Sequence, residues 1–391
     1  MTSTLLYVTP HRVRGAGLPN RPAALLEGLV RSRAFDRVVV VNRLRADRLV
    51  RSGAGGRLRR RGPWWWIERD LEGLTLVEHL WPFGQAESGA LPAIARAMIA
   101  GGSGRDGDLV IWVADPKSAI VFETMESWAA GVPVIRVFDA YDAWDLSPLV
   151  RGNRRRDAVR RGYAVAARCA DVVFANSPFM ADRMRHGGAN IVHLVTNGAP
   201  GVSESTELAG SLPHRLGFAY VGRVHERVAV PLLEALADEA RPEPLRIIGP
   251  IEREPDGWRR LIARDNVVLE GSRPQVAAHR ILAETRALIV PHVVDDYTRS
   301  QDAMKVWDAL SIGTPVIATS IPPAASLPDY AVLLADNPDA VRAAAQRIIR
   351  GELAPFAAQR RALAAENSWD RRIEAIRREI DGLRESRKAT G

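Results

Sequence analysis

Short apolar runs alternate with longer stretches of helical period along most of the chain, and this alternation limits the fold more than any other feature. Runs such as 5–9, 172–175 and 287–291 have the length of buried strands. Helical segments of ten or more residues lie between many of the runs, which is the order found in βαβ units and parallel sheets. The pattern therefore predicts an α/β protein with doubly wound, Rossmann-like sheets.

The alternation is interrupted once, by a small and polar segment at 201–214 that contains no clear period. A chain of 391 residues is long enough for two domains. We predict a first domain over 1–200, a linker over 201–214, a second domain over 215–366, and a helix over 367–391 that crosses back to the first domain. Because doubly wound sheets bind ligands at the carboxyl ends of their strands, we expect the site in the cleft between the domains.

Composition removes several classes of protein. The one cysteine, Cys169, excludes an internal disulfide and any multi-cysteine metal site. The chain has no apolar window of membrane-spanning length and no basic leader before its first apolar run, so we expect a cytoplasmic protein. Lys and Arg together number 54 against 46 Asp and Glu, yet only Lys117, Lys305 and Lys388 are lysines. Arginine is the default cation here, so each lysine is the more informative residue.

The strongest local signal lies between Asp295 and Thr319. A predicted strand that ends at Pro291 is followed by a polar loop and then by a helix whose N-terminal region is Ser300–Asp302. The free N–H groups and the dipole of a helix N-terminus favour an anion such as a diphosphate. Lys305 adds a positive charge in the first turn, and Asp308 follows on the same face, where it can accept hydrogen bonds from sugar hydroxyls. The alternative is a surface ion pair between Lys305 and Asp308.

A second candidate follows the predicted strand 217–221. Gly222 allows a ligand to approach the backbone, and Arg223 and Arg227 would neutralise a diphosphate. Solvated surface arginines are the alternative. The loop 10–22 also contains glycines, Gly15 and Gly17, but it fails the dinucleotide fingerprint because its third glycine position is Asn20.

Taken together, these segments resemble GT-B glycosyltransferases of the family 4 type, particularly bacterial cell-wall and exopolysaccharide enzymes. The resemblance is carried in the second half by FAYVGRVHERVAVPLLEALA, LRIIGP, NVVLEGSRP, ALIVPHVVDDYTRSQDAMKVWDALSIGTPVIAT and NSWDRRIEAI, and more loosely in the first half by DLVIWVADP and VIRVFDAYDAWD. It implies two Rossmann-like domains that face each other across a cleft. It also implies a hexosyltransferase that moves a sugar from a nucleotide-diphosphate sugar to an acceptor hydroxyl with retention, without a metal or a cofactor.

The same resemblance assigns roles to individual residues. Arg223 and Lys305 are expected to hold the donor diphosphate, with Arg227 as a second cation. Asp308 stands where the family usually has a ribose-binding glutamate, and Ser300 replaces the family's other motif glutamate. The expected donor-binding residues are Gly15, Gly17, Gly222, Arg223, Arg227, Gly249, Arg273, Ser300, Gln301, Asp302, Lys305 and Asp308.

The first domain is then expected to bind the acceptor. Phe138 occupies the place where many relatives have a histidine, so Asp139 is predicted to take over that role. The predicted catalytic residues are Asp139, Arg223 and Lys305. The predicted acceptor-binding residues are Asn20, Arg21, Asp139, Tyr141 and Asp142, for an acceptor that is a small molecule, a glycan or a lipid-linked sugar.

Several alternatives remain open from the sequence. A nucleotide-sugar epimerase has the same fold, and a non-catalytic sugar-nucleotide binder would explain the missing glutamate at Ser300. Two groups of arginines have several possible roles: those of 57–61 beside Trp64–Trp66, and those of 151–161. They could lie in a solvated loop, contact the inner face of a membrane, or bind a nucleic acid. We do not expect a nucleic acid as a partner. Asp106 and Asp108 form a DxD pattern, but it precedes a strand, where a turn is the simpler interpretation.

Overall fold

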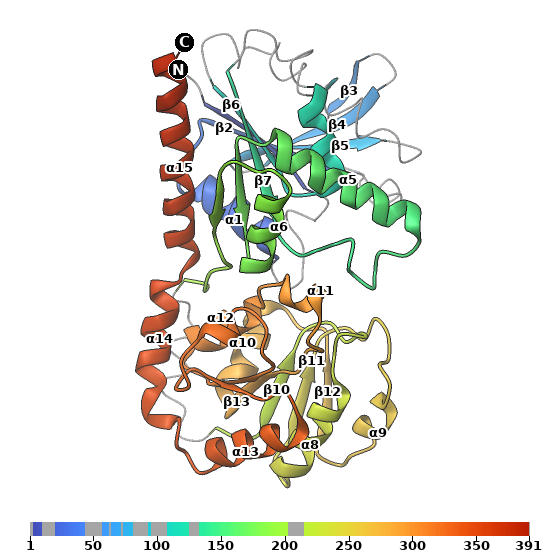
Figure 1. The fold of residues 1–391 in the computed structure, drawn as a ribbon. Helices are drawn as coiled ribbons and strands as arrows, with labels where there is room; N and C mark the ends of the chain where they lie inside the picture. The colour runs from blue at the N-terminus through green and yellow to red at the C-terminus, as the bar shows by residue number, and fades with distance from the viewer. Residues whose placement is uncertain are drawn as a thin grey trace. The chain divides into compact units, whose positions relative to one another are not determined.

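The computed structural model describes residues 3–9, 20–43, 57–61, 64–71, 73–80, 93–94, 108–124, 133–201 and 215–390. These residues form two compact units, each built on its own sheet (Figure 1). Unit 1 contains the described residues of 3–9, 21–195 and 373–390, and unit 2 contains Asn20 and 196–372. The α/β fold with parallel sheets that the sequence predicts is confirmed.

Within the described residues, the sheet of unit 1 has the strand order β3-β4-β5-β2-β1-β6-β7-β8-β9. The strands are β1 (Thr4–Val8), β2 (Arg37–Arg43), β3 (Arg57–Arg61), β4 (Trp64–Leu71), β5 (Leu74–Leu80), β6 (Leu109–Val113), β7 (Val134–Ala140), β8 (Val172–Ala175) and β9 (Val192–Leu194). From β5 to β9 all neighbours are parallel, whereas β4 is antiparallel to both β3 and β5. The carboxyl ends of the parallel strands therefore share one edge.

Alternate residues of these strands face opposite helical layers. Leu6 and Ile111 belong to a core that includes Val159 of α5 (Asn153–Cys169) and Met180 of α6 (Pro178–His186). The opposite face carries a stack of Tyr7, Trp112 and Phe174, whose ring centroids lie 5.8 and 5.4 Å apart along the stack. The hydroxyl of Tyr7 donates to the carbonyl of Pro22, in α1 (Arg21–Arg31), so this face meets α1.

Within the described residues, the sheet of unit 2 is entirely parallel, in the order β12-β11-β10-β13-β14-β15. The strands are β10 (Phe218–Val221), β11 (Leu245–Ile248), β12 (Val267–Gly271), β13 (Ala287–Val290), β14 (Val316–Ala318) and β15 (Val332–Leu334). One face packs on α8 (Val230–Ala240), α9 (Trp258–Ile262) and α13 (Pro338–Ile349). The other packs on α10 (Gln275–Glu284), α12 (Met304–Ser311) and α14 (Ala357–Glu366).

Two expected boundaries need correction. Residues 196–200 were assigned to the first domain but belong to unit 2. The physical reason is that the side chain of Asn197 donates to the carbonyl of Asp302 at 2.8 Å, and Ala199 pairs with Ser368. Most of the expected linker, 202–214, lies outside the described residues. The last helix, α15 (Trp369–Thr390), belongs to unit 1 from Ile373 onward.

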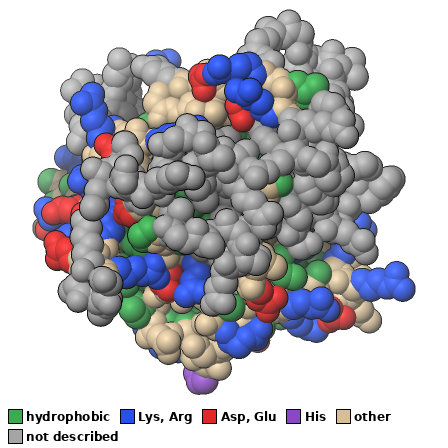
Figure 2. All heavy atoms as spheres, turned by 90° about the horizontal axis from the view of Figure 1, so that it is seen from above, with side chains coloured by type: hydrophobic (Ala, Val, Ile, Leu, Met, Phe, Trp, Pro, Cys, Tyr) green, Lys and Arg blue, Asp and Glu red, His purple; other side chains and the backbone are tan. Residues whose placement is uncertain are grey.

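The arginines of 57–61 and the tryptophans of 64–66 lie on adjacent strands of an antiparallel hairpin, so the alternative of a solvated loop for these arginines is wrong. Arg57 pairs with Asp70, and Arg59 pairs with Glu68. On the face of the molecule in Figure 2, described basic side chains lie among acidic ones. In the described parts of the chain, no helix combines the length and apolar character needed to cross a membrane.

Close packing between α1 and α15 gives the first testable prediction. A Cβ atom on Gly28 would lie 2.5 Å from Cγ1 of the buried Ile373, so only glycine allows this approach. We expect Gly28→Val to lower the free energy of unfolding by about 2 kcal/mol through overpacking. Ile373→Ala in the same chain should recover part of that loss, because it removes the clashing group.

Urea unfolding of the four chains measures this coupling. Gly382→Ala is the matched control, because a Cβ at this α15 position meets nothing within 4 Å. It should leave stability unchanged or raise it by up to about 1 kcal/mol. Additive effects of Gly28→Val and Ile373→Ala would contradict the proposed packing.

Candidate functional site

The candidate site lies at the carboxyl edge of the sheet in unit 2, where β10 and β11 end in glycines. Gly222 has a φ of +146° and Gly249 a φ of +139°, a region that side chains other than glycine rarely adopt. The N–H of Gly222 donates to the carbonyl of Ile248 at 2.8 Å, which holds the two strand ends together. A Cβ atom on Gly249 would overlap the carbonyl oxygen of Gly222. Both positions therefore require glycine for close backbone packing.

Lys305 occupies the first turn of α12, as the sequence predicts, and its ammonium reaches this edge. Its Nζ lies 4.7 Å from the centroid of the Tyr220 ring and 3.5 Å from Nε2 of His292. A Cβ atom on Gly222 would lie 2.5 Å from this Nζ, so the absence of a side chain at Gly222 leaves room for the ammonium. Desolvation, reinforced by the positive charge of Arg227, lowers the pKa of Lys305 well below its ordinary value.

Two histidines beside these cations are neutral at pH 7. Burial lowers the pKa of His292 well below its ordinary value, and Lys305, Arg227 and His225 lower it further. Burial also lowers the pKa of His225 to about 4, with Arg227 as the next cause. Their uncharged state means that these histidines add hydrogen-bonding groups to the site and no charge.

Arg227 supplies the second cation. Its Nη1 lies 3.4 Å from Oε1 of Gln301, while its Nε is buried without a hydrogen-bond partner. Among the described residues, no carboxylate lies within salt-bridge distance of Arg227 or Lys305. Asp308 directs Oδ1 toward Nε2 of His279 at 3.4 Å, so the surface ion pair between Lys305 and Asp308 is not formed. An uncompensated, poorly hydrated pair of cations is a binding site for an anion.

The segment before α12 differs from the expected helix start. A short helix, α11 (Asp296–Arg299), begins with a capping box formed by Asp295 and Thr298, and Ser300 ends it. The N-cap of α12 is Ala303, so the prediction that 300–302 begins this helix was wrong. The buried hydroxyl of Ser300 donates to the carbonyl of Tyr297 at 2.6 Å, which fixes the turn between the two helices.

Two of the predicted donor-binding arginines lie at the surface. Arg223 is paired with Glu252 at 2.9 Å, and Arg273 is paired with Glu270 at 3.0 Å. Arg223 is largely exposed, so its charge is better hydrated than that of Arg227. Their assignment to the donor stays a prediction. Gly15 and Gly17 lie outside the described residues.

The residues predicted to bind the acceptor gather at the carboxyl edge of the sheet in unit 1. Asp139, in β7, is buried and its Oδ1 accepts from Nε of Arg21 at 2.9 Å. Arg21 also donates to the carbonyl of Val195 at 2.7 Å. Burial raises the pKa of Asp139, against the opposing effect of Arg21. The second carboxylate oxygen of Asp139, Oδ2, is buried without a hydrogen-bond partner.

Tyr141 and Asp142 lie two and three residues after Asp139. Burial, together with the negative charge of Asp139, raises the pKa of Tyr141 well above its ordinary value. Asp142 has a φ of +54°, a conformation that aspartate tolerates better than most residues, and its carbonyl accepts from the hydroxyl of Tyr163 at 2.5 Å. Asn20 is half-buried and lies directly before α1. The structure thus brings Arg21, Asp139, Tyr141 and Asp142 to one edge of unit 1.

Sequence reasoning missed Tyr220, His225 and His279 as members of the unit 2 site. Tyr220 belongs to an apolar run that predicts a strand. Its ring contacts the ammonium of Lys305 only because the fold brings β10 next to α12. His225 lies within the motif FAYVGRVHERV, but its neutral state depends on burial and on Arg227. A lone histidine in sequence carries no signal of either property.

Comparisons with known proteins show which family model and which solved structures the chain resembles. Residues 215–351 match the family model described as glycosyl transferases group 1. No curated protein matches the chain in sequence. Among solved structures, sucrose-phosphate synthase from Thermosynechococcus elongatus aligns over 100% of both chains with 16% identity and a TM-score of 0.65.

Two further structures are similar. Anabaena Alr3699/HepE, solved in complex with UDP, covers 99% of this chain and 100% of its own at 16% identity and a TM-score of 0.65. An α,α-trehalose-phosphate synthase (UDP-forming) from Burkholderia xenovorans, in complex with glucose-6-phosphate, covers 97% and 100% at 11% identity and a TM-score of 0.66. The chain has the GT-B fold of these glycosyltransferases. The match of residues 215–351 to the glycosyl transferases group 1 model, together with this fold, confirms the resemblance seen in the sequence.

The buried His225 gives a prediction for pH dependence. Its pKa is about 4 in the folded chain and 6.5 as an ordinary histidine, so between these values the unfolded chain binds a proton that the folded chain does not. The free energy of unfolding should therefore fall as the pH decreases through this window, with His225 contributing roughly 3 kcal/mol. In His225→Gln this contribution is absent.

Urea unfolding between pH 7 and 4 measures the slope for each chain. His186→Gln is the control, because His186 is an exposed histidine at the end of α6. It should keep the wild-type slope. A His225→Gln chain with the same slope as the wild type would show that His225 titrates normally in the folded protein.

Proposed function

We propose that the protein is a glycosyltransferase that transfers a hexose from a nucleotide-diphosphate sugar to an acceptor hydroxyl. The observation that carries this proposal is the pair of cations, Lys305 and Arg227, at the carboxyl edge of unit 2, which meet no carboxylate at salt-bridge distance in the described part of the chain. A diphosphate supplies the missing negative charge. The UDP bound in the similar HepE structure makes a uridine nucleotide the first donor to test.

The chemistry of the reaction fits this charge arrangement. The bond between the anomeric carbon and the diphosphate oxygen breaks, and its electron pair leaves with the diphosphate. Fixed cations beside the departing oxygens stabilise the charge that develops there, by about 3–4 kcal/mol for one such contact. Lys305 and Arg227 are held in place by Tyr220 and Gln301, so little reorganisation is needed. We propose that this stabilisation replaces a metal ion.

The acceptor would bind at the carboxyl edge of unit 1. Oδ2 of Asp139 is a buried hydrogen-bond acceptor without a partner, so it can receive a hydrogen bond from a substrate hydroxyl. Arg21 holds the other oxygen of the carboxylate in place. We assign the proton of the acceptor hydroxyl to the departing diphosphate, and retention of configuration follows if attack occurs on the same face. No nucleophilic side chain is required.

The basic side chains of unit 1 bear on whether the acceptor is bound to a membrane. Arg57 and Arg59 are both paired with carboxylates of β4, so hydration and ion pairing account for them. Arg151, Arg154 and Arg155 are exposed around the start of α5 and are the basic residues through which contact with an anionic bilayer would occur.

Lys305→Met tests the donor site. The substitution keeps an unbranched side chain of similar length over Tyr220 and removes the charge. We expect it to weaken binding of UDP by about 10- to 100-fold, the loss of one charge-assisted hydrogen bond, while binding of uridine stays unchanged. The ligand-free variant should be more stable than the wild type by roughly 1 kcal/mol, because a desolvated cation next to Arg227 is gone.

Isothermal titration calorimetry and thermal unfolding measure these two effects. Arg280→Ala is the control, because Arg280 is an exposed cation on α10. It should bind UDP as the wild type does. Equal UDP affinity in Lys305→Met and the wild type, in a protein that binds UDP, would remove Lys305 from the donor site. If none of the UDP, GDP, TDP and ADP sugars binds, the proposed activity itself is wrong.

Asp139→Asn tests the acceptor side. We expect unchanged affinity for the donor and a loss of at least about 100-fold in kcat, because the amide cannot accept through both oxygens as the carboxylate does. The substitution also leaves Arg21 buried without its charge partner, which costs about 3–5 kcal/mol of stability.

The double variant Arg21→Gln, Asp139→Asn separates the two effects. It removes both charges and should recover stability in urea unfolding, yet remain as inactive as Asp139→Asn. Turnover of the donor sugar, followed by chromatography of released nucleotide, gives kcat and KM for each chain. Recovery of activity together with stability would show that Asp139 has a structural role only.

A further inference from the structure

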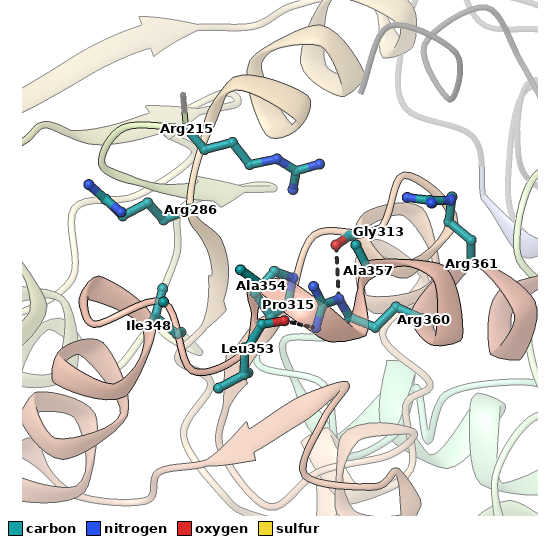
Figure 3. A pocket seen from close by; sticks show the side chains of 11 residues that line it. Arg215, Arg286, Gly313, Pro315, Ile348, Leu353, Ala354, Ala357, Arg360 and Arg361 are labelled. Carbon is teal, nitrogen blue, oxygen red and sulfur yellow. Dashed lines mark hydrogen bonds between the residues drawn. The ribbon is translucent and has the colours of Figure 1, made fainter. Parts of the chain in front are cut away.

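A second group of cations lies at the opposite edge of the same sheet. Arg215 precedes β10, Arg286 precedes β13, and Arg360 and Arg361 are neighbours on α14. Together with Gly313 and the loop around Leu353 they surround a pocket of about 320 Å³ (Figure 3). The amino ends of the parallel strands meet here, whereas Lys305 and Arg227 lie at the carboxyl ends. The two sites are therefore separate.

The charges in this pocket are unevenly compensated. Arg286 forms a bidentate pair with Glu243, with both distances 2.7 Å, so its charge is neutralised. Within the part of the chain that the structure describes, Arg215 donates only to neutral acceptors, the hydroxyl of Thr314 at 2.8 Å and the carbonyl of Ile312 at 3.3 Å. Among the residues that line the pocket there is no carboxylate.

Arg360 and Arg361 add two more positive charges from the helix side. Arg360 is buried, and its guanidinium donates to the carbonyls of Gly313 at 2.8 Å, Tyr330 at 2.7 Å and Leu353 at 2.9 Å. The dashed lines in Figure 3 mark the bonds to Gly313 and Leu353. Burial, together with the positive charges of Arg215 and Arg361, lowers the pKa of Arg360 to about 10. The three arginines are thus close enough to repel one another.

Gly313 has the same relation to Arg361 as Gly222 has to Lys305. A Cβ atom on Gly313 would lie 2.7 Å from Nη1 of Arg361, and its φ of +78° also requires glycine. The backbone here leaves space for a guanidinium that has no carboxylate partner among the described residues. The opposite wall is apolar and includes Ile348, Leu353 and Pro315.

We propose that this pocket binds a small phosphorylated ligand, with its phosphoryl group between Arg215, Arg360 and Arg361. Guanidinium groups present forked donors that match the oxygens of a phosphoryl group, and no carboxylate lines the pocket to neutralise Arg215, Arg360 and Arg361. The volume suits a small ligand, and the apolar wall accommodates its uncharged part. The pocket is distinct from the donor site, so its ligand acts on the protein without taking part in sugar transfer.

Inorganic pyrophosphate is the probe. To exclude the donor site, all chains carry Lys305→Met, and the comparison adds either Arg361→Gln or Arg280→Gln. Arg361 is only half-buried, and within the described residues no hydrogen bond joins it to the loops that Arg360 holds, so its replacement should leave the fold intact. Titration calorimetry and thermal unfolding are performed against potassium chloride of equal ionic strength.

We expect pyrophosphate to raise the melting temperature of the Lys305→Met chain in a concentration-dependent manner, through preferential binding to the folded state. Arg361→Gln should weaken the affinity at least tenfold (about 1.4 kcal/mol), whereas Arg280→Gln should not change it. Absence of binding to the Lys305→Met chain, or equal affinity in the Arg361→Gln chain, would overturn the proposal. Neither result bears on UDP binding by the wild type, so failure here is distinguishable from failure of the proposed activity.

A lipid headgroup presents the same phosphoryl chemistry as a soluble ligand. Sedimentation with phosphatidylglycerol vesicles distinguishes the two sources. Vesicle binding that is lost in Arg361→Gln assigns the pocket to a headgroup. Pyrophosphate binding without an effect of Arg361→Gln on vesicle binding assigns it to a soluble phosphate.

Discussion

Both faces of the sheet in unit 2 are covered by helices, and this constraint decides where chemistry can occur. Successive residues of β10, such as Tyr220 and Val221, point into two different apolar cores. The strands β10, β13 and β14 carry no charged side chain on either face, so charged groups collect where these strands end. The two cationic sites, around Lys305 at the carboxyl edge and around Arg361 at the amino edge, follow from the same architecture.

At both edges of the sheet, a glycine leaves space for a cation beside the strand ends. A cation that is to meet a ligand must reach the strand ends, and a side chain on the neighbouring backbone would block it. Gly222 leaves this space for Lys305, and Gly313 leaves it for Arg361. In each case the cation lacks a carboxylate partner among the described residues, and Lys305 is also desolvated. Such an arrangement lowers the stability of the folded protein when no ligand is bound, and the binding of an anion restores that stability.

The sequence predicted the elements of unit 2 well because each carries a strong local signal. The apolar runs of β11 and β13, and the helix Gln275–Glu284, appear where the periodicity places them. Prediction from the sequence failed where two local signals compete over a few residues. The segment 295–303 contains a capping box and a polar turn, so the expected single helix start became α11, a turn at Ser300 and then α12. The hairpin of β3 and β4 was missed because its arginine-rich strand lacks an apolar face.

The sequence by itself determined the α/β class, the family resemblance and the place of Lys305 in the first turn of a helix, because spacing and composition act locally along the chain. Only the tertiary structure decided which cations are uncompensated. The sequence favoured Arg223 over Arg227, yet Arg223 is exposed and paired with Glu252, whereas the charge of Arg227 is close enough to lower the pKa of Lys305. Burial and the position of the nearest carboxylate depend on residues far apart in the chain, and these two quantities set the energy of a charge in a protein.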